Sequence, residues 1–228
     1  MRATHTHRTQ QIGFTLIELM VAIGIMAMMA GLSWRGIDGM ARAQTQIKER
    51  ADAVLTLQAG LAQWSADLDA IVQLPQNPAL NWDGRGLRLT RRSTQVAGDG
   101  ILVVAWARRN TLETTGGQWL RWQSAPSYTR EELQTAWSRA EQWAQNPVAA
   151  DKRLEVRIGP LQDWQIFFFR GNAWTNPLSS AGGSFAGAAS EAALLPDGVR
   201  LVLNLPANQA ISGTLVRDWA RPALAGNR

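Results

Sequence analysis

The sequence contains no cysteine, and its only two histidines, His5 and His7, come before residue 14. Without cysteine the fold has no disulfide bond, so core packing has to stabilise it. From residue 14 onward the chain also lacks the usual transition-metal ligands, the thiol nucleophile and the commonest general base. We therefore expect no metal site, no cofactor and no enzymatic activity.

Charge is also sparse and evenly spread. Lysine and arginine number 23 against 18 acidic residues, a formal net charge of +5 in 228 residues. A nucleic-acid-binding surface would need a clustered basic patch with interleaved aromatic residues, and the sequence has none. We expect neither a nucleic acid nor a small-molecule substrate as a partner.

An apolar run from Phe14 to Trp34 is the main feature that is present, and it holds a single charge, Glu18. As a helix its 21 residues would be about 31 Å long, which matches the bilayer core. The run predicts one transmembrane segment, and Arg2 and Arg8 before it favour a cytoplasmic amino terminus. Because a carboxylate in hydrocarbon costs on the order of 1 to 3 kcal/mol, Glu18 needs a partner.

The helical pattern continues beyond this run. Apolar residues recur at spacings of three, four and seven from Ile37 to Ile71. The simplest interpretation is one continuous helix that ends near Leu74, just before Pro75. Its part from Val54 to Val72 has the stronger apolar face, and we expect that part to pack on a sheet.

From Trp82 onward, the sequence has short runs in which apolar and polar residues alternate, separated by turn residues. These runs predict strands. The candidate strands cover residues 86–91, 101–108, 118–123, 153–158, 164–170, 199–205 and 212–219. Thr129 and Glu132 have capping-box spacing and predict a second helix over 129–145. Residues 171–193, rich in Gly, Ala, Ser and Asn around Trp174, are expected to form a long loop. The chain is thus predicted to be α+β, a domain of antiparallel hairpins on a long amino-terminal helix.

The junction before the apolar run reads Gly13-Phe-Thr-Leu-Ile-Glu18 and resembles the processing site of type IV pilins and of type II secretion pseudopilins. The resemblance implies that a prepilin peptidase cuts between Gly13 and Phe14 and methylates the new amino terminus of Phe14. Glu18 would then accept the new α-ammonium group of a neighbouring subunit during assembly. The alternative is an uncleaved signal anchor. An ordinary signal peptide would need a small-residue cleavage site after the apolar run, and none is evident.

The same resemblance implies a pilin-like fold with four parts. They are a cleaved cytoplasmic leader (1–13), a transmembrane segment (14–34), a periplasmic continuation of the helix (35–74) and a periplasmic α+β domain (75–228).

Three later stretches resemble the J-type minor pseudopilin of type II secretion. They are Ser33-Trp-Arg-Gly-Ile-Asp-Gly39, the helix rhythm of Leu57 to Leu68, and Leu195-Pro-Asp-Gly-Val-Arg-Leu-Val-Leu203. This resemblance implies an inner-membrane subunit that joins the I-type and K-type minor pseudopilins in the tip complex that primes pseudopilus assembly for protein export. K-type subunits characteristically lack the carboxylate, so Glu18 favours the J-type.

Two other functions stay open. One is a minor pilin of a type IV pilus, and the other is a membrane-tethered periplasmic binding module with its ligand near Trp119, Trp122 or Trp174. Most of the eleven tryptophans are expected in the core, with Trp64 or Trp82 as candidate partner anchors.

Several charged residues have both a structural and a functional interpretation. Five aspartates are candidate calcium ligands, although Asp-Gly is first a turn signal: Asp67, Asp69, Asp83, Asp99 and Asp197. We expect Asp38 to contact another subunit. A cluster of arginines is expected to form a solvated strand face: Arg85, Arg88, Arg91 and Arg92.

Overall fold

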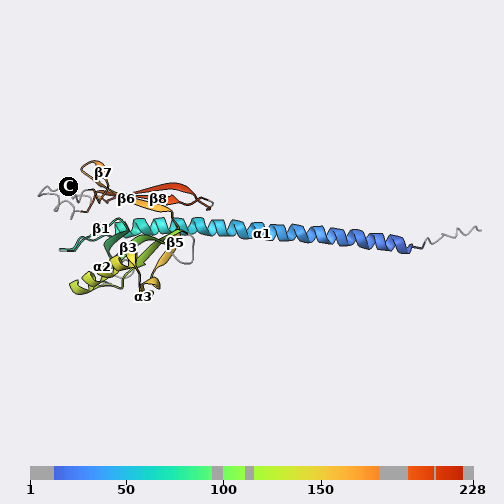
Figure 1. Ribbon diagram of the computed structural model, residues 1–228, viewed down its shortest axis with the longest axis horizontal. Helices are drawn as coiled ribbons and strands as arrows, with labels where there is room; N and C mark the ends of the chain where they lie inside the picture. The colour runs from blue at the N-terminus through green and yellow to red at the C-terminus, as the bar shows by residue number, and fades with distance from the viewer. Residues whose placement is uncertain are drawn as a thin grey trace, which may run out of the picture. The chain divides into compact units, whose positions relative to one another are not determined.

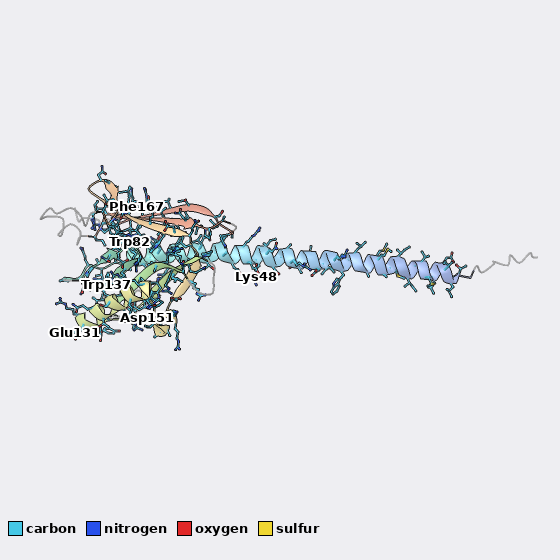
Figure 2. All side chains as sticks on the ribbon, in the orientation of Figure 1. Lys48, Trp82, Glu131, Trp137, Asp151 and Phe167 are labelled. Atoms are coloured by element: carbon cyan, nitrogen blue, oxygen red, sulfur yellow. The ribbon has the colours of Figure 1, made fainter. Side chains whose placement is uncertain are left out.

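The structure is a computed structural model that describes residues 13–75, 77–93, 100–110, 116–179, 195–207 and 209–222. The chain divides into two compact units, Met1–Glu49 and Arg50–Arg228, and helix α1 (Leu16–Asp69) contributes to both. In the first unit every described residue is exposed, and side chains such as Lys48 extend outward from the helix (Figure 2).

Helix α1 ends at Asp69, five residues before the predicted end at Leu74. The chain leaves the helix because its backbone turns to pair with a strand. Val72 N–H donates to the Thr90 carbonyl at 3.0 Å, Arg92 N–H donates to the Ala70 carbonyl at 3.1 Å, and Ile71 forms a bridge with Arg91. These bonds replace the helical ones, so the prediction that the helix ends near Leu74 was wrong.

The described residues form two antiparallel sheets, and the first has five strands in the order β1-β2-β3-β4-β5. They are β1 (Leu80–Trp82), β2 (Gly86–Arg92), β3 (Ile101–Asn110), β4 (Gly117–Gln123) and β5 (Val156–Pro160). Leu89 lies opposite Val104, and Trp106 lies opposite Arg121. Most residues of β2, β3 and β4 are buried on both sides of the sheet, so both faces of this sheet are covered.

The second sheet has four strands in the order β7-β6-β8-β9. They are β6 (Asp163–Arg170), β7 (Ala173–Thr175), β8 (Gly198–Leu205) and β9 (Gly213–Ala220). Buried and less buried residues alternate along β6 and β8, which is the pattern of a sheet with one face on the core.

In the second unit, residues 50–69 of α1 lie between the two sheets (Figure 1). The principal core joins Leu57, Trp64 and Leu68 of α1 to the inner faces of both sheets. Trp64 is at the centre of this core, with ring centroids 5.4 Å from Trp106 and 6.4 Å from Trp164. This packing confirms that the second part of α1 has the apolar face that binds a sheet.

Helix α2 (Arg130–Gln145) covers the other face of the five-stranded sheet and forms a second core with it (Figure 1). The predicted capping box is present. Thr129 Oγ1 accepts from Glu132 N–H at 3.2 Å, and the Glu132 carboxylate accepts from Thr129 N–H at the same distance. Trp137, labelled in Figure 2, donates its Nε1–H to Thr90 Oγ1 at 3.0 Å. The sequence thus predicted this helix correctly.

The strand predictions agree with the structure except at a few places. The strand expected over 153–158 begins later, at Val156, because residues 149–152 form a short helix, α3 (Ala149–Lys152). Strands β1 and β7 were not predicted, since three-residue strands carry almost no periodicity. Residues 173–175 of the expected loop pair with β6, and residues 180–193 of that loop lie outside the described residues.

Candidate functional site

The amino-terminal junction lies on an exposed segment just before α1. Gly13, Phe14 and Thr15 precede the first helical residue, Leu16, and Phe14 is 87% exposed. Apart from its chain neighbours, no atom of the described residues lies within 4 Å of the position that a Cβ on Gly13 would occupy. Within the part of the chain that the structure describes, both residues that flank the Gly13–Phe14 peptide bond are therefore exposed.

Thr15 and Glu18 form a capping box at the start of α1. Glu18 Oε2 accepts from Thr15 N–H at 3.0 Å and from Thr15 Oγ1 at 2.9 Å, while Thr15 Oγ1 lies 3.4 Å from Glu18 N. A capping box satisfies backbone N–H groups that the first helical turn leaves without partners. The carboxylate in the apolar run thus already has a partner within its own chain.

The structure revealed a role for Thr15 that the sequence interpretation overlooked. The signal was available, because Thr15-x-x-Glu18 has the same spacing as Thr129-x-x-Glu132. Both hydrogen bonds that the Glu18 carboxylate accepts from Thr15 use Oε2.

The start of α1, from Leu16 to Trp34, presents an apolar surface in which Glu18 is the single charged residue. Its exposed large side chains include Leu16, Ile17, Leu19, Met20, Val21, Ile23, Ile25, Met26, Met28, Met29, Leu32 and Trp34. Among the described residues, α1 is the one helix long and apolar enough to cross a membrane. Lipid or neighbouring helices would cover such a surface, because exposed apolar side chains are unfavourable in water.

A buried ionic cluster lies where α1 meets the five-stranded sheet, and we call it the aspartate cluster. Its centre is Asp67, which is fully buried. Arg121 donates to it twice, from Nε at 2.8 Å and from Nη2 at 2.9 Å. Arg91 donates through Nη1, Trp106 through Nε1 at 2.9 Å, and Gln63 through Nε2 at 2.8 Å.

The aspartate cluster joins α1 to three successive strands, since Arg91, Trp106 and Arg121 belong to β2, β3 and β4. A buried carboxylate is tolerated when several donors compensate for its lost hydration, and here five donor atoms do so. Asp67 is therefore a structural anchor of the helix on the sheet, and its oxygens are occupied by protein donors.

Two of the arginines that were expected to be solvated are buried. Arg91 pairs with Asp67, and Arg88 donates to Glu141 Oε2 at 2.8 Å on α2. The prediction was wrong for these two, because the outer face of β2 is covered by α2 and its inner face by α1. Arg85 and Arg92 are exposed, as predicted.

The aspartates proposed as calcium ligands serve other purposes. Asp83 caps the turn before β2 and accepts from Gly86 N–H at 2.8 Å. Asp69 accepts from Trp219 Nε1 at 2.8 Å, and Asp197 pairs with Arg221. Asp99 lies outside the described residues. Within the described ranges, no group of three His, Cys, Asp or Glu side chains is placed to hold a metal ion.

The tryptophans are mostly core residues, as expected. Trp119 and Trp122 are buried, so neither offers a ring to a ligand at the surface, which removes two of the three positions considered for a binding module. Trp64 is completely buried and Trp82 is nearly so; neither is an exposed partner anchor in this chain. Trp174 is half-buried on β7 and lies under the Arg200 guanidinium at 4.3 Å.

Asp38 forms an ion pair with Arg42 one helical turn later on α1. The pair is exposed, so it contributes little to stability and leaves both side chains accessible. The expectation that Asp38 contacts another subunit stays a prediction.

Comparison with known proteins identifies the amino-terminal segment. Residues 8–34 match the family described as "Prokaryotic N-terminal methylation motif". No curated protein matches the chain. The match contains Gly13, Phe14, Thr15 and Glu18, and it supports a protein of the type IV pilin-like and pseudopilin group.

The fold agrees with this assignment. A long amino-terminal helix packed on antiparallel sheets makes the chain α+β and is consistent with the pilin-like fold that the sequence predicted. The motif and the long apolar helix together indicate a membrane-anchored, single-pass protein. Partnership with other pilin-like subunits and processing by a prepilin peptidase follow from the same motif.

Proposed function

We propose that the chain is a minor pseudopilin of the J-type, a structural subunit of a type II secretion system. The observation that supports this most strongly is the methylation motif with Glu18 retained at the start of α1. The three J-type stretches add support, and one of them contains Asp67, the centre of the aspartate cluster. The chain would lie in the inner membrane with its second unit in the periplasm, and would join I-type and K-type minor pseudopilins.

In this proposal, a prepilin peptidase cleaves the exposed bond between Gly13 and Phe14 and methylates Phe14. Cleavage leaves a new α-ammonium group four residues before Glu18. Glu18 Oε2 keeps its hydrogen bonds to Thr15, and Oε1 accepts the ammonium group of a neighbouring subunit. Both charges are neutralised in low dielectric, where an unpaired charge would be costly.

The second unit would act by presenting surfaces, without catalysis or a cofactor. The described residues from 14 onward include no histidine and no cysteine, so the usual nucleophile and base pair is missing from them. The aspartate cluster supports a mechanical role, because it fixes the sheet to the same helix that enters the membrane.

Copurification tests this proposal. The full-length chain, tagged at its carboxyl terminus, is solubilised from membranes in mild detergent, and its bound partners are identified by mass spectrometry. We expect I-type and K-type minor pseudopilins, and we expect Glu18→Ala to reduce their yield while leaving the amount of the tagged chain unchanged.

Recovery of type IV pilus subunits in place of secretion subunits would reject the J-type assignment in favour of a minor pilin. Recovery of neither, from a chain that is processed normally, would favour a tethered binding module.

A further inference from the structure

An open pocket of about 440 Å³ lies at one end of the five-stranded sheet, and three arginines line it. Arg85 comes from the β1–β2 turn, and Arg108 and Arg109 come from the end of β3. The end of α2 and the start of β6 complete the walls. We call this site the arginine pocket; neither the methylation motif nor the membrane helix accounts for it.

Arg108 is held in position before any ligand arrives. Its Nε–H donates to the Leu161 carbonyl at 3.1 Å. The side chain lies directly on the backbone of Gly117, where a Cβ would be only 2.4 Å from Arg108 Nε and 2.6 Å from its Cζ. Glycine at 117 therefore makes room for the guanidinium group. Among the described residues, Arg108 has no carboxylate partner.

Arg109 is already neutralised. It forms an ion pair with Glu155, and its Nη1 donates to the Trp143 carbonyl at 2.8 Å. The two remaining cations, Arg85 and Arg108, share the pocket with one anion, Asp163. Outside the Arg109–Glu155 pair, the lining residues that the structure describes thus carry a net charge of +1.

The neutral part of the lining suits a polypeptide. Asn110 and Gln145 are primary amides, which can both donate to and accept from a peptide backbone. Trp164 and Ala144 give an apolar wall beside them. Arginine presents paired N–H groups whose spacing fits the two oxygens of a carboxylate.

We propose that the arginine pocket binds a carboxylate side chain of an acidic peptide segment on a partner protein. A single carboxylate balances the net charge of +1, whereas the second negative charge of a phosphate would meet Asp163. Arg108 donates paired hydrogen bonds to the carboxylate, and Arg85 contacts the carboxylate from the β1–β2 turn. The side-chain amides of Asn110 and Gln145 form hydrogen bonds with the flanking backbone of the peptide. This proposal is independent of the secretion assignment.

The test uses the full-length protein in detergent micelles with arginine side chains labelled with nitrogen-15. The probe is the blocked tripeptide acetyl-Ala-Glu-Ala-amide, and the matched neutral probe is acetyl-Ala-Gln-Ala-amide. We expect the glutamate peptide to shift the Nε–H resonance of Arg108 saturably, and the glutamine peptide to bind at least about tenfold more weakly. Equal binding of the two peptides would overturn the proposal.

Variants assign the effect to the pocket. Arg85→Gln removes an exposed charge without changing the core, and it is expected to weaken binding of the glutamate peptide about tenfold. Arg108→Lys keeps the positive charge but loses the paired N–H donors of the guanidinium group, and it is expected to weaken binding of the glutamate peptide as well. Arg217→Gln, an exposed arginine on β9, is the control and should change nothing.

Inorganic phosphate provides the competing ligand. If phosphate displaces the glutamate peptide at a lower concentration than the peptide itself binds, the pocket is an oxyanion site for phosphate and the carboxylate proposal is wrong. If Arg85→Gln and Arg108→Lys both bind the peptide as tightly as the unchanged chain, the proposal is also wrong. Weaker binding by both variants with no displacement by phosphate supports it.

Discussion

Asp67 on α1 and Arg121 on β4 form a two-point contact in the core, with Arg121 Nε 2.8 Å from Oδ2 and Nη2 2.9 Å from Oδ1. The two residues are 54 positions apart in the chain, and both are buried. Such a paired contact fixes both distance and angle between a helix and a strand. It sets how the five-stranded sheet sits on the helix.

Asp67→Asn should destabilise the second unit strongly. The amide keeps the volume but leaves two buried guanidinium groups without their carboxylate, and breaking a buried ion pair in this way costs about 3 to 5 kcal/mol. Urea unfolding of the full chain in detergent, followed by tryptophan fluorescence, measures the loss. Asp52→Asn, at an exposed position of the same helix, is the control. Equal midpoints for the two variants would show that the cluster does not hold the helix to the sheet.

Gly60→Ala should also destabilise the second unit, although alanine is a better helix former than glycine by about 1 kcal/mol. A Cβ at this position would be 2.3 Å from Ile158 Cγ2, so helix and strand have to move apart. Gly36→Ala in the same helix meets no atom within 4 Å and should not lower the urea midpoint. The combination of Gly60→Ala with Ile158→Ala should recover part of the loss, and its failure to do so would reject the steric explanation.

Changing Gly13 to a bulky residue such as leucine should block processing. The precursor would then keep its 13-residue leader, which intact-mass spectrometry detects directly, together with the missing methyl group on Phe14. Gly24→Leu, inside the apolar run, is the matched control and should be processed normally. Normal cleavage of the Gly13 variant would exclude the proposed site.

Thr15 and Glu18 allow the capping role of the carboxylate to be separated from its charge. Thr15→Val removes the cap and leaves the charge, whereas Glu18→Gln removes the charge and leaves an oxygen that accepts from Thr15. If Glu18 pairs with an ammonium group of a neighbouring subunit, Glu18→Gln should reduce copurification of partner subunits much more than Thr15→Val does. The opposite order would mean that the helix cap is what assembly requires.

The capping box of α2 predicts a pH dependence. Hydrogen bonds from the backbone N–H groups of Tyr128 and Thr129 lower the pKa of Glu132 below its ordinary value. A lowered pKa in the folded state stabilises the fold above the ordinary value, and this contribution is lost as the pH falls through the lowered value. Glu132→Gln should therefore reduce the fall of the urea unfolding midpoint at acidic pH. Glu131→Gln, one residue away and exposed, should leave it unchanged.

Features that depend on neighbouring residues in the chain were predictable. The junction from Gly13 to Glu18, the start of α2 at Thr129 and most strands of both sheets follow from spacing and turn residues alone. Short strands such as β1 were missed because three residues carry too little periodicity. The end of α1 was misplaced because strand β2, which is distant in sequence, takes over its backbone hydrogen bonds.

The sequence by itself determined that this chain carries a methylation motif, an apolar helix with one carboxylate, and an α+β domain without cysteine, because each of these is written in local patterns. Only the tertiary structure decided what the charges do. Asp67 was a candidate calcium ligand and Arg91 was expected on a solvated strand face, yet both are buried, because α1 and α2 cover the two faces of the same sheet. Arg85 and Arg108 line one pocket because strand pairing brings together residues that are distant in the chain.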